Sequence, residues 1–384
     1  MDTKLRKDST VLRYVCLHVV LISLVLTGCG SPSIHVGPSS SAPQSPPLTS
    51  TPPSEDTTSQ IDKILSLHTE DETFTGAVLV ARNGEILLGQ GYGWADRENQ
   101  ITNTPQTKYR LGSITKQFTA MAVLILQSWG QLDVQDPICR YLPECPDSWQ
   151  EITIHHLLSH TSGIPNLTEF PNFKTFKAMP STPEQTIARF KDKPLDFQPS
   201  EKWNYSNSGY VLLGYIIEQV SGQSYEMFLQ ENIFDPLGMT STGYDHNDGS
   251  LATGYTGVDS HWDKPDDIDM TLPYAAGGLY STVEDLYLWD QALYTEQLVP
   301  QESLDLMFTS HAEMTMNGMG YGYGWFVGKL NSHLAVSHGG GIDGFITEIR
   351  RYIADDATIV ILSNRQTTNV PQIADQIGSV VFKK

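Results

Sequence analysis

Segments with strand-like composition lie at the two ends of the globular part of this chain, and this distribution constrains the fold most. At the first end, residues 76–93 hold two apolar runs joined by Asn83-Gly84, a dipeptide typical of tight β-hairpins. At the other end, three strand-like segments precede a terminal helix, at residues 334–338, 345–352, 357–364 and 371–382. Because helical patterns fill the chain between, we predict an α+β fold, with an antiparallel sheet built from both chain ends, flanking helices and an inserted helical region.

Three helices are predicted outside the C-terminal segment. A short one covers residues 60–70, and an apolar one covers residues 209–222. The third runs from Ser113 to Trp129, where apolar residues recur at helical spacing. Since Lys116 follows Ser113 by three residues, both side chains should lie on the same side of its first turn.

The composition indicates a globular protein that does not bind nucleic acid. The chain has 384 residues, of which 39% are hydrophobic, so it can bury a substantial core. Its formal net charge is −20, and no long basic run follows the first few residues. Because nucleic-acid binding needs clustered Lys and Arg, the absence of such clusters argues against a nucleic-acid partner. Oligomeric state is not predicted.

The N-terminus predicts export and a lipid anchor. Residues 1–28 combine several basic residues with a short apolar run, which is the pattern of a signal peptide. They are followed by Cys29, and the sequence Leu26-Thr27-Gly28-Cys29 resembles the bacterial lipobox, whose cysteine is lipidated. The alternatives are a plain secretory signal and an uncleaved anchor. We expect a bacterial membrane as a partner through Cys29, and a location outside the cytoplasm in the cell envelope.

A Ser- and Pro-rich segment separates this anchor from the globular domain. Residues 29–58 contain almost nothing apolar and should form an extended tether, so the folded domain covers residues 59–384. Within it, Cys139 and Cys145 are close enough in sequence to form a disulfide outside the cytoplasm, with free thiols as the alternative. A metal site would need two more soft ligands nearby, and none is present.

Three short motifs could carry chemistry. In the first, Ser113 at a helix start could be a nucleophile, with a partly desolvated Lys116 as its base. Taken alone, the pair is better explained as polar residues at a helix cap. In the second, Tyr205-x-Asn207, the phenol could be a core residue, or a proton shuttle whose pKa is lowered by the lysine cation.

The third motif is His338 followed by three glycines. Gly339, Gly340 and Gly341 allow the backbone to approach a ligand closely, and an N–H there could complete an oxyanion hole. The alternative is a glycine-rich turn with a surface histidine.

In this order the three motifs resemble the active-site signature of the serine β-lactamase and penicillin-binding protein superfamily, in the branch of class C β-lactamases, D-alanyl-D-alanine carboxypeptidases and related esterases. The resemblance covers about residues 75–380, with further support from ITIHHLLSHTSGIP (152–165), IFDPLGMTST (233–242), AAGGLYSTVEDLYLW (275–289) and GYGWFV (322–327).

The resemblance implies a role for each motif residue. Ser113 would attack an acyl carbonyl, while Lys116 and Tyr205 share the proton transfers. Asn207 would position the substrate and the lysine, and the N–H groups of Ser113 and Gly341 would hold the oxyanion. The substrate would be a small-molecule or peptide acyl compound, with no metal or organic cofactor.

One departure from the family pattern affects the expected substrate. The third motif in β-lactamases is Lys-Thr-Gly, where this chain has His338-Gly339-Gly340. The lysine and threonine help to recognise the substrate's carboxylate, whereas a histidine is only partly protonated near neutral pH and glycine has no hydroxyl. We therefore expect ester, amide or cell-wall peptide substrates in preference to β-lactams.

A histidine motif and a histidine pair elsewhere in the sequence do not fit a catalytic or metal site. His160-Thr161-Ser162-Gly163 also resembles a third motif, but it precedes Tyr205 and corresponds to a structural turn in the family. His156 and His160 lack the glutamate of a zinc-protease helix. We therefore predict an extracytoplasmic serine hydrolase, with a true β-lactamase or D,D-carboxypeptidase as the alternative enzyme. A catalytically silent envelope-binding protein is the non-enzymatic alternative.

Overall fold

A computed structural model describes residues 55–258, 261–314 and 318–383. The predicted signal peptide (1–28), Cys29 and all but the last four residues of the predicted tether (29–58) lie outside these described residues. Among the residues described, no helix combines the length and the apolar character that a membrane crossing requires.

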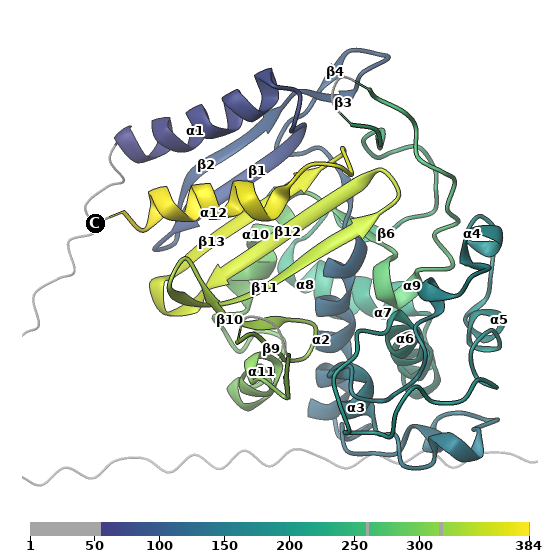
Figure 1. Ribbon diagram of the computed structural model, residues 1–384. Helices are drawn as coiled ribbons and strands as arrows, with labels where there is room; N and C mark the ends of the chain where they lie inside the picture. The colour runs from purple at the N-terminus through teal and green to yellow at the C-terminus, as the bar shows by residue number, and fades with distance from the viewer. Residues whose placement is uncertain (1–54, 259–260, 315–317, 384) are drawn as a thin grey trace, which may run out of the picture. The chain divides into compact units, whose positions relative to one another are not determined.

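The described residues are organised around an eight-stranded antiparallel sheet in which the two ends of the domain lie side by side (Figure 1). Strand β1 pairs with β13 from Gly76 opposite Ser363 to Arg82 opposite Ala357. The strand order is β2-β1-β13-β12-β11-β10-β9-β8. In chain order the strands are β1 (Gly76–Arg82), β2 (Glu85–Tyr92), β8 (Ala312–Glu313), β9 (Gly320–Tyr321), β10 (Phe326–Leu330), β11 (His333–Ile342), β12 (Phe345–Tyr352) and β13 (Ala357–Ser363). The predicted α+β fold, with a sheet built from both chain ends, is confirmed.

The turn between β1 and β2 has the geometry that its sequence predicts. Asn83 and Gly84 have φ values of 53° and 74°, and both positive values are required by a two-residue turn that matches the twist of the strands. Asn and Gly adopt such values at the lowest cost. The predicted hairpin is thus confirmed.

One face of the sheet is covered by the first and last helices. Helices α1 (Glu55–Glu70) and α12 (Val370–Val381) lie side by side across it (Figure 1). Alternate strand residues such as Val78 and Ile361 point into this layer, because successive strand side chains face opposite sides. Helix α1 begins before the predicted start of the domain at residue 59: its first turn, rich in Thr and Ser, has the composition of the tether, but the helix continues into Ile61 and Leu65, which are buried.

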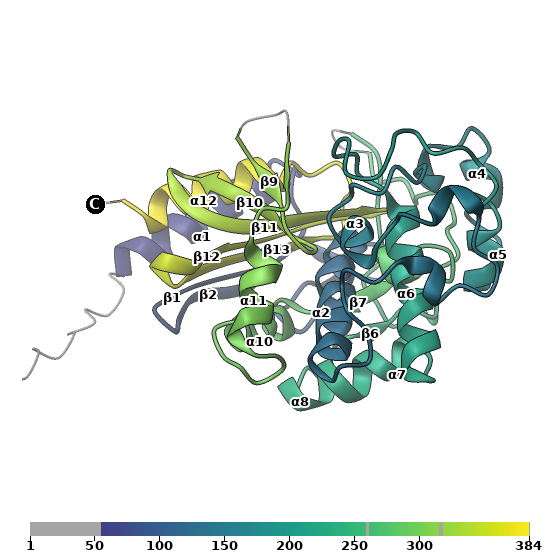
Figure 2. The same cartoon turned by 90° about the horizontal axis from the view of Figure 1, so that it is seen from below.

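The opposite face of the sheet packs against the helical region, as the view from below shows (Figure 2). The larger of the two clusters of buried hydrophobic residues lies on this side. Helix α2 (Thr115–Ser128) is buried along nearly its whole length, and helix α6 (Asn207–Ser221) packs on it. The remaining helices are α3 (Ile154–Leu158), α4 (Phe173–Phe176), α5 (Pro183–Ile187), α7 (Tyr225–Leu229), α8 (Asp235–Leu237), α9 (Tyr274–Gly277), α10 (Val283–Ala292) and α11 (Gln301–Phe308), with single turns η1 (Gly112–Ile114), η2 (Ile138–Arg140), η3 (Asp147–Trp149), η4 (Leu167–Glu169), η5 (Gln230–Phe234) and η6 (Ile353–Asp355).

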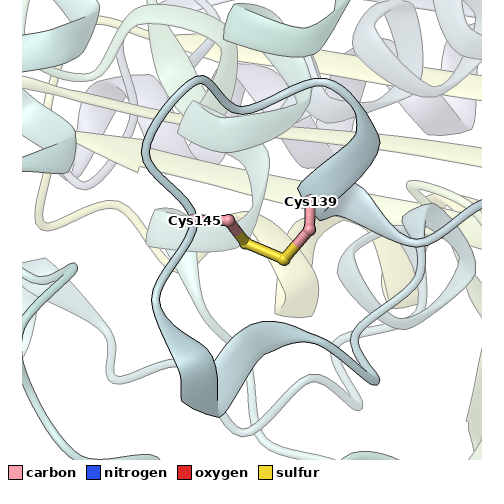
Figure 3. Close-up of a disulfide and its surroundings, with 2 residues drawn as sticks. All are labelled: Cys139 and Cys145. Atoms are coloured by element: carbon pink, nitrogen blue, oxygen red, sulfur yellow. A yellow bond between two sulfur atoms is a disulfide. The ribbon is translucent and has the colours of Figure 1, made fainter.

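Short strands form two further small sheets. One joins β3 (Trp94–Asp96) to β4 (Ile101–Thr102), and the other has the order β5 (Tyr109–Arg110), β7 (Leu279–Ser281), β6 (Gly243–Tyr244). In the helical region, Cys139 and Cys145 are joined by a disulfide with their Cα atoms 5.2 Å apart (Figure 3).

Candidate active site

Ser113 lies at a junction between a tight turn and a long buried helix. It belongs to the 3-10 turn η1, which continues into α2, so Lys116 stands in the first turn of that helix. Gly112 supports this turn with a φ of 54°, a value that L-residues with side chains rarely adopt. The Nζ atom of Lys116 is 3.1 Å from the Oγ atom of Ser113, as the spacing predicted.

Three groups surround the amine of Lys116, and none is a carboxylate. Its Nζ lies 2.8 Å from Asn207 Oδ1 and 2.7 Å from the carbonyl oxygen of Ala276, besides Ser113 Oγ. Among the described residues it forms no ion pair with an acid, and it is fully buried. Burial disfavours the charged form and holds the pKa of Lys116 well below its usual value.

Tyr205 lies over this lysine. Its ring centroid is 4.8 Å from Lys116 Nζ, and its hydroxyl is buried without a hydrogen bond of good geometry. Burial raises the pKa of the Tyr205 phenol, and the nearby Ser113 hydroxyl only partly offsets this. The phenol is therefore neutral at pH 7, which corrects the expectation that a lysine cation would lower its pKa. That expectation assumed a charged lysine, whereas burial disfavours charge on both groups.

Asn207 is fixed in one orientation. Its Nδ2 donates to Asn166 Oδ1 at 3.3 Å and to Thr168 Oγ1 at 3.1 Å, which directs its Oδ1 toward Lys116. Asn166, which is 6% exposed, also accepts from the backbone N–H of Asn207. Sequence reasoning missed Asn166, because its contact with Asn207 joins residues 41 positions apart.

The glycines after His338 lie within a strand and not in a turn. Strand β11 continues to Ile342, but its pairing with β10 ends at Ser337, so η1 packs against the unpaired edge beyond that residue. A Cβ atom at Gly340 would collide with the carbonyl oxygen of Leu111, and one at Gly112 would lie 2.9 Å from Gly341 N. The glycines therefore let β11 approach the backbone beside Ser113.

His338 is buried and neutral. Its Nδ1 donates to the carbonyl oxygen of Gly339 at 2.6 Å, and its Nε2 accepts from the Tyr321 hydroxyl at 3.1 Å. Burial, with a smaller contribution from Lys116, lowers the pKa of His338 to about 3. The expected partial charge near neutral pH is therefore wrong, because the imidazole is 2% exposed.

A cavity of about 290 Å³ opens at Ser113. Ser113, Asn207 and Gly341 line it, whereas Lys116, Tyr205, His338, Gly339 and Gly340 do not. Most of the remaining wall is apolar, formed by Leu167, Phe173, Val211, Ile268, Leu272, Pro273 and Ile342. Of the described residues that line it, Asp343 carries the single charge. The cavity is therefore suited to an acyl group with a mainly apolar body.

His160 contacts Tyr205, although its motif was interpreted as a structural turn alone. Its ring centroid is 4.3 Å from that of Tyr205, its Nδ1 accepts from the N–H of Ser206 at 3.2 Å, and its carbonyl accepts from the N–H of Asn204 at 2.9 Å. His156, in contrast, contacts Ser200 Oγ at 2.7 Å. In the described part of the chain, no three His, Cys, Asp or Glu side chains are arranged to hold a metal ion.

Comparison with known proteins identifies the family to which this geometry belongs. The model of the family described as Beta-lactamase matches residues 61–380. The putative penicillin-binding protein PbpX of Bacillus subtilis (strain 168) is 34% identical over 310 residues, which are 79% of this chain and 74% of that protein.

Two solved structures have the same fold. The octameric penicillin-binding protein homologue from Pyrococcus abyssi superposes with a TM-score of 0.76 and 29% identity, covering 85% of this chain and 77% of that one. The D-amino acid amidase from Ochrobactrum anthropi SV3, complexed with D-phenylalanine, has a TM-score of 0.74 and 25% identity over 85% of this chain and 99% of that one. This chain therefore belongs to the Beta-lactamase family, within the serine hydrolase superfamily of serine β-lactamases and penicillin-binding proteins.

Proposed function

We propose that this protein hydrolyses ester, amide or cell-wall peptide bonds through an acyl-enzyme on Ser113. The observation that carries the proposal is the contact of Ser113 Oγ with a buried lysine that lacks an acidic partner. Burial favours the neutral amine of this lysine, and a neutral amine within hydrogen-bond distance is the kind of base that a serine nucleophile needs.

The contacts of Lys116 support one direction for the first proton transfer. Two of its three partners, Asn207 Oδ1 and the Ala276 carbonyl, can only accept hydrogen bonds. A neutral amine has two N–H groups and one lone pair, so these acceptors take both N–H groups. The lone pair then faces the Ser113 hydroxyl and accepts its proton as Oγ attacks the acyl carbonyl.

The oxyanion that forms would be held by the backbone N–H groups of Ser113 and Gly341. This follows from the close approach of β11 to η1, where Gly112 and Gly341 are in contact. Each such donor is worth roughly 3–4 kcal/mol in the transition state. The neutral Tyr205 phenol would then donate its proton to the leaving group and take the proton held by Lys116, which restores both residues. Water finally releases the acid from Ser113.

The relatives' names support this range of bonds without selecting one. One relative is named a penicillin-binding protein and another a D-amino acid amidase. The alternative is that the protein is a β-lactamase or a D,D-carboxypeptidase. The relative named a putative penicillin-binding protein favours this alternative. The predicted signal peptide and the lipobox-like sequence at Cys29 support a lipid-anchored protein outside the cytoplasm.

Covalent labelling tests the proposal against a catalytically silent protein of the same fold. A soluble protein beginning at Ser54 would be exposed to a fluorophosphonate, which phosphonylates activated serines, and analysed by intact-protein mass spectrometry. We expect one adduct, lost in Ser113→Ala and retained in Ser128→Ala, a serine at the far end of helix α2. Folded wild-type protein that stays unlabelled would contradict the proposal.

A further inference from the structure

Lys177 is the cation held directly behind the charged wall of the catalytic cavity. Its side chain is 8% exposed, and its Nζ forms an ion pair with Oδ1 of Asp343, which lines the cavity. A second carboxylate, Asp266 Oδ2, lies 3.5 Å from the same Nζ but is 72% exposed. Lys177 itself does not line the cavity.

Asp343 stands close to the reacting groups. It follows Gly341 by two residues, in the turn between β11 and β12, and Gly341 lines the same cavity as Ser113. No Lys or Arg is found among the described residues of the lining. A substrate carboxylate at this end of the cavity would therefore meet a carboxylate first, with the lysine already paired behind it.

The adjoining surface has the same sign of charge. A second cavity, of about 600 Å³, shares Asp343 and Ile268 with the first, and its wall includes four more aspartates: Asp245, Asp266, Asp267 and Asp269. Of the two cations in that wall, Arg110 is paired with Asp245 at 2.7 Å. With a formal charge of −20, the chain as a whole also repels anionic ligands.

We propose that Asp343 determines specificity by masking Lys177, so that the enzyme takes acyl substrates without a carboxylate at this end of the cavity. The proposal rests on the hydrolase function proposed above. Lys177 is then a concealed carboxylate-binding cation, and removing the charge of Asp343 should reveal it. The isosteric change Asp343→Asn keeps the side chain's size and leaves Lys177 without its less exposed anionic partner.

The test compares two esters with the same leaving group in the soluble protein beginning at Ser54. The p-nitrophenyl ester of butyric acid is neutral, and the p-nitrophenyl monoester of glutaric acid carries a carboxylate on an acyl chain of similar length. We expect the wild type to have the higher kcat/KM for the neutral ester. In Asp343→Asn the ratio of anionic to neutral kcat/KM should rise about tenfold, which corresponds to ~1.4 kcal/mol.

Matched variants separate this effect from its alternatives. Asp266→Asn removes the exposed partner of the same lysine and should change the ratio by less than about twofold, since screening weakens exposed charges. The double change Asp343→Asn with Lys177→Met should abolish the gain. An unchanged ratio in Asp343→Asn, or a wild type that prefers the anionic ester, would overturn the proposal. If Asp343→Asn does not fold, the wild-type preference alone decides.

Failure of the proposed function gives a different result. A protein without hydrolase function would cleave neither ester and would carry no fluorophosphonate adduct on Ser113. If the protein is labelled on Ser113 but prefers the anionic ester, the proposed hydrolase function stands. Only the proposed specificity role of Asp343 is then contradicted.

Discussion

At the scale of single residues, the site holds ionisable groups whose charged forms are disfavoured by burial. Lys116, Tyr205 and His338 lie together without an acid, so charge on any one of them is unfavourable. The sequence alone predicted that the residues of these three motifs form one site. Their protonation could not be predicted, because it depends on burial by residues far away in the chain, such as Tyr321 beside His338.

His160 is expected to be a positioning residue for Tyr205 and Asn207, because it binds the N–H groups of Asn204 and Ser206 and packs on the Tyr205 ring. His160→Leu should lower kcat roughly 10–100-fold with little change in KM, since small misplacements of catalytic groups are costly. Kinetics with a neutral ester, well below the unfolding temperature of each variant, measure this.

The conservative variant His160→Asn serves as the rescue. Asn offers an oxygen near the position of Nδ1 and tolerates the φ of 59° at this residue, so it should retain most of the lost activity. His156→Leu, which alters a contact to Ser200, should leave kcat near the wild-type value. Normal kcat in His160→Leu would show that the side-chain contacts of His160 to Ser206 and Tyr205 are dispensable.

At the scale of elements, the site forms where the unpaired edge of β11 packs against η1. Thr347 of β12 donates to the Leu111 carbonyl at 2.8 Å, which ties the sheet to the turn that holds Ser113. The hairpin, both terminal helices and the strand composition of β11 were predictable from local sequence. Its continuation through three glycines was not, because glycine is a weak strand former and tertiary contacts decide here.

Gly340 is expected to tolerate no side chain. In Gly340→Ala the added Cβ would collide with the Leu111 carbonyl and Thr347 Oγ1, so the free energy of unfolding should fall by roughly 1–3 kcal/mol. Thermal unfolding measures this directly. Gly341→Ala is the control, because no heavy atom lies within 4 Å of a Cβ built there. Equal unfolding temperatures for the two variants would contradict the close approach.

At the scale of the whole domain, the candidate catalytic residues come from distant parts of the chain. Ser113 and Lys116 come from α2 and the turn before it, Asn207 from the start of α6, and Gly341 from the sheet. The cavity opens where these elements meet, on the face of the sheet opposite α1 and α12. Sequence patterns predict each element, but not how loops such as 166–200 and 261–272 close around the cavity. The ion pair of Lys177 with Asp343 joins positions 166 apart and had no local signal.

The pH dependence of Ser113 labelling tests the central claim, that neutral Lys116 is the base for Ser113. The fluorophosphonate rate constant should follow the unprotonated fraction of Lys116, so it should rise with pH through the pKa of that amine and then level off. Because burial lowers this pKa well below 10.5, the plateau should begin below pH 10.5. His338, with a pKa of about 3, is already neutral over this range.

Intact-protein mass spectrometry gives the rate constants at each pH, with Lys116→Met as the control. We predict a plateau for the wild type and a slow, plateau-free rate for Lys116→Met. A wild-type rate that keeps rising with hydroxide beyond pH 10.5, or a Lys116→Met variant labelled as fast as the wild type, would contradict the assignment of Lys116 as the base.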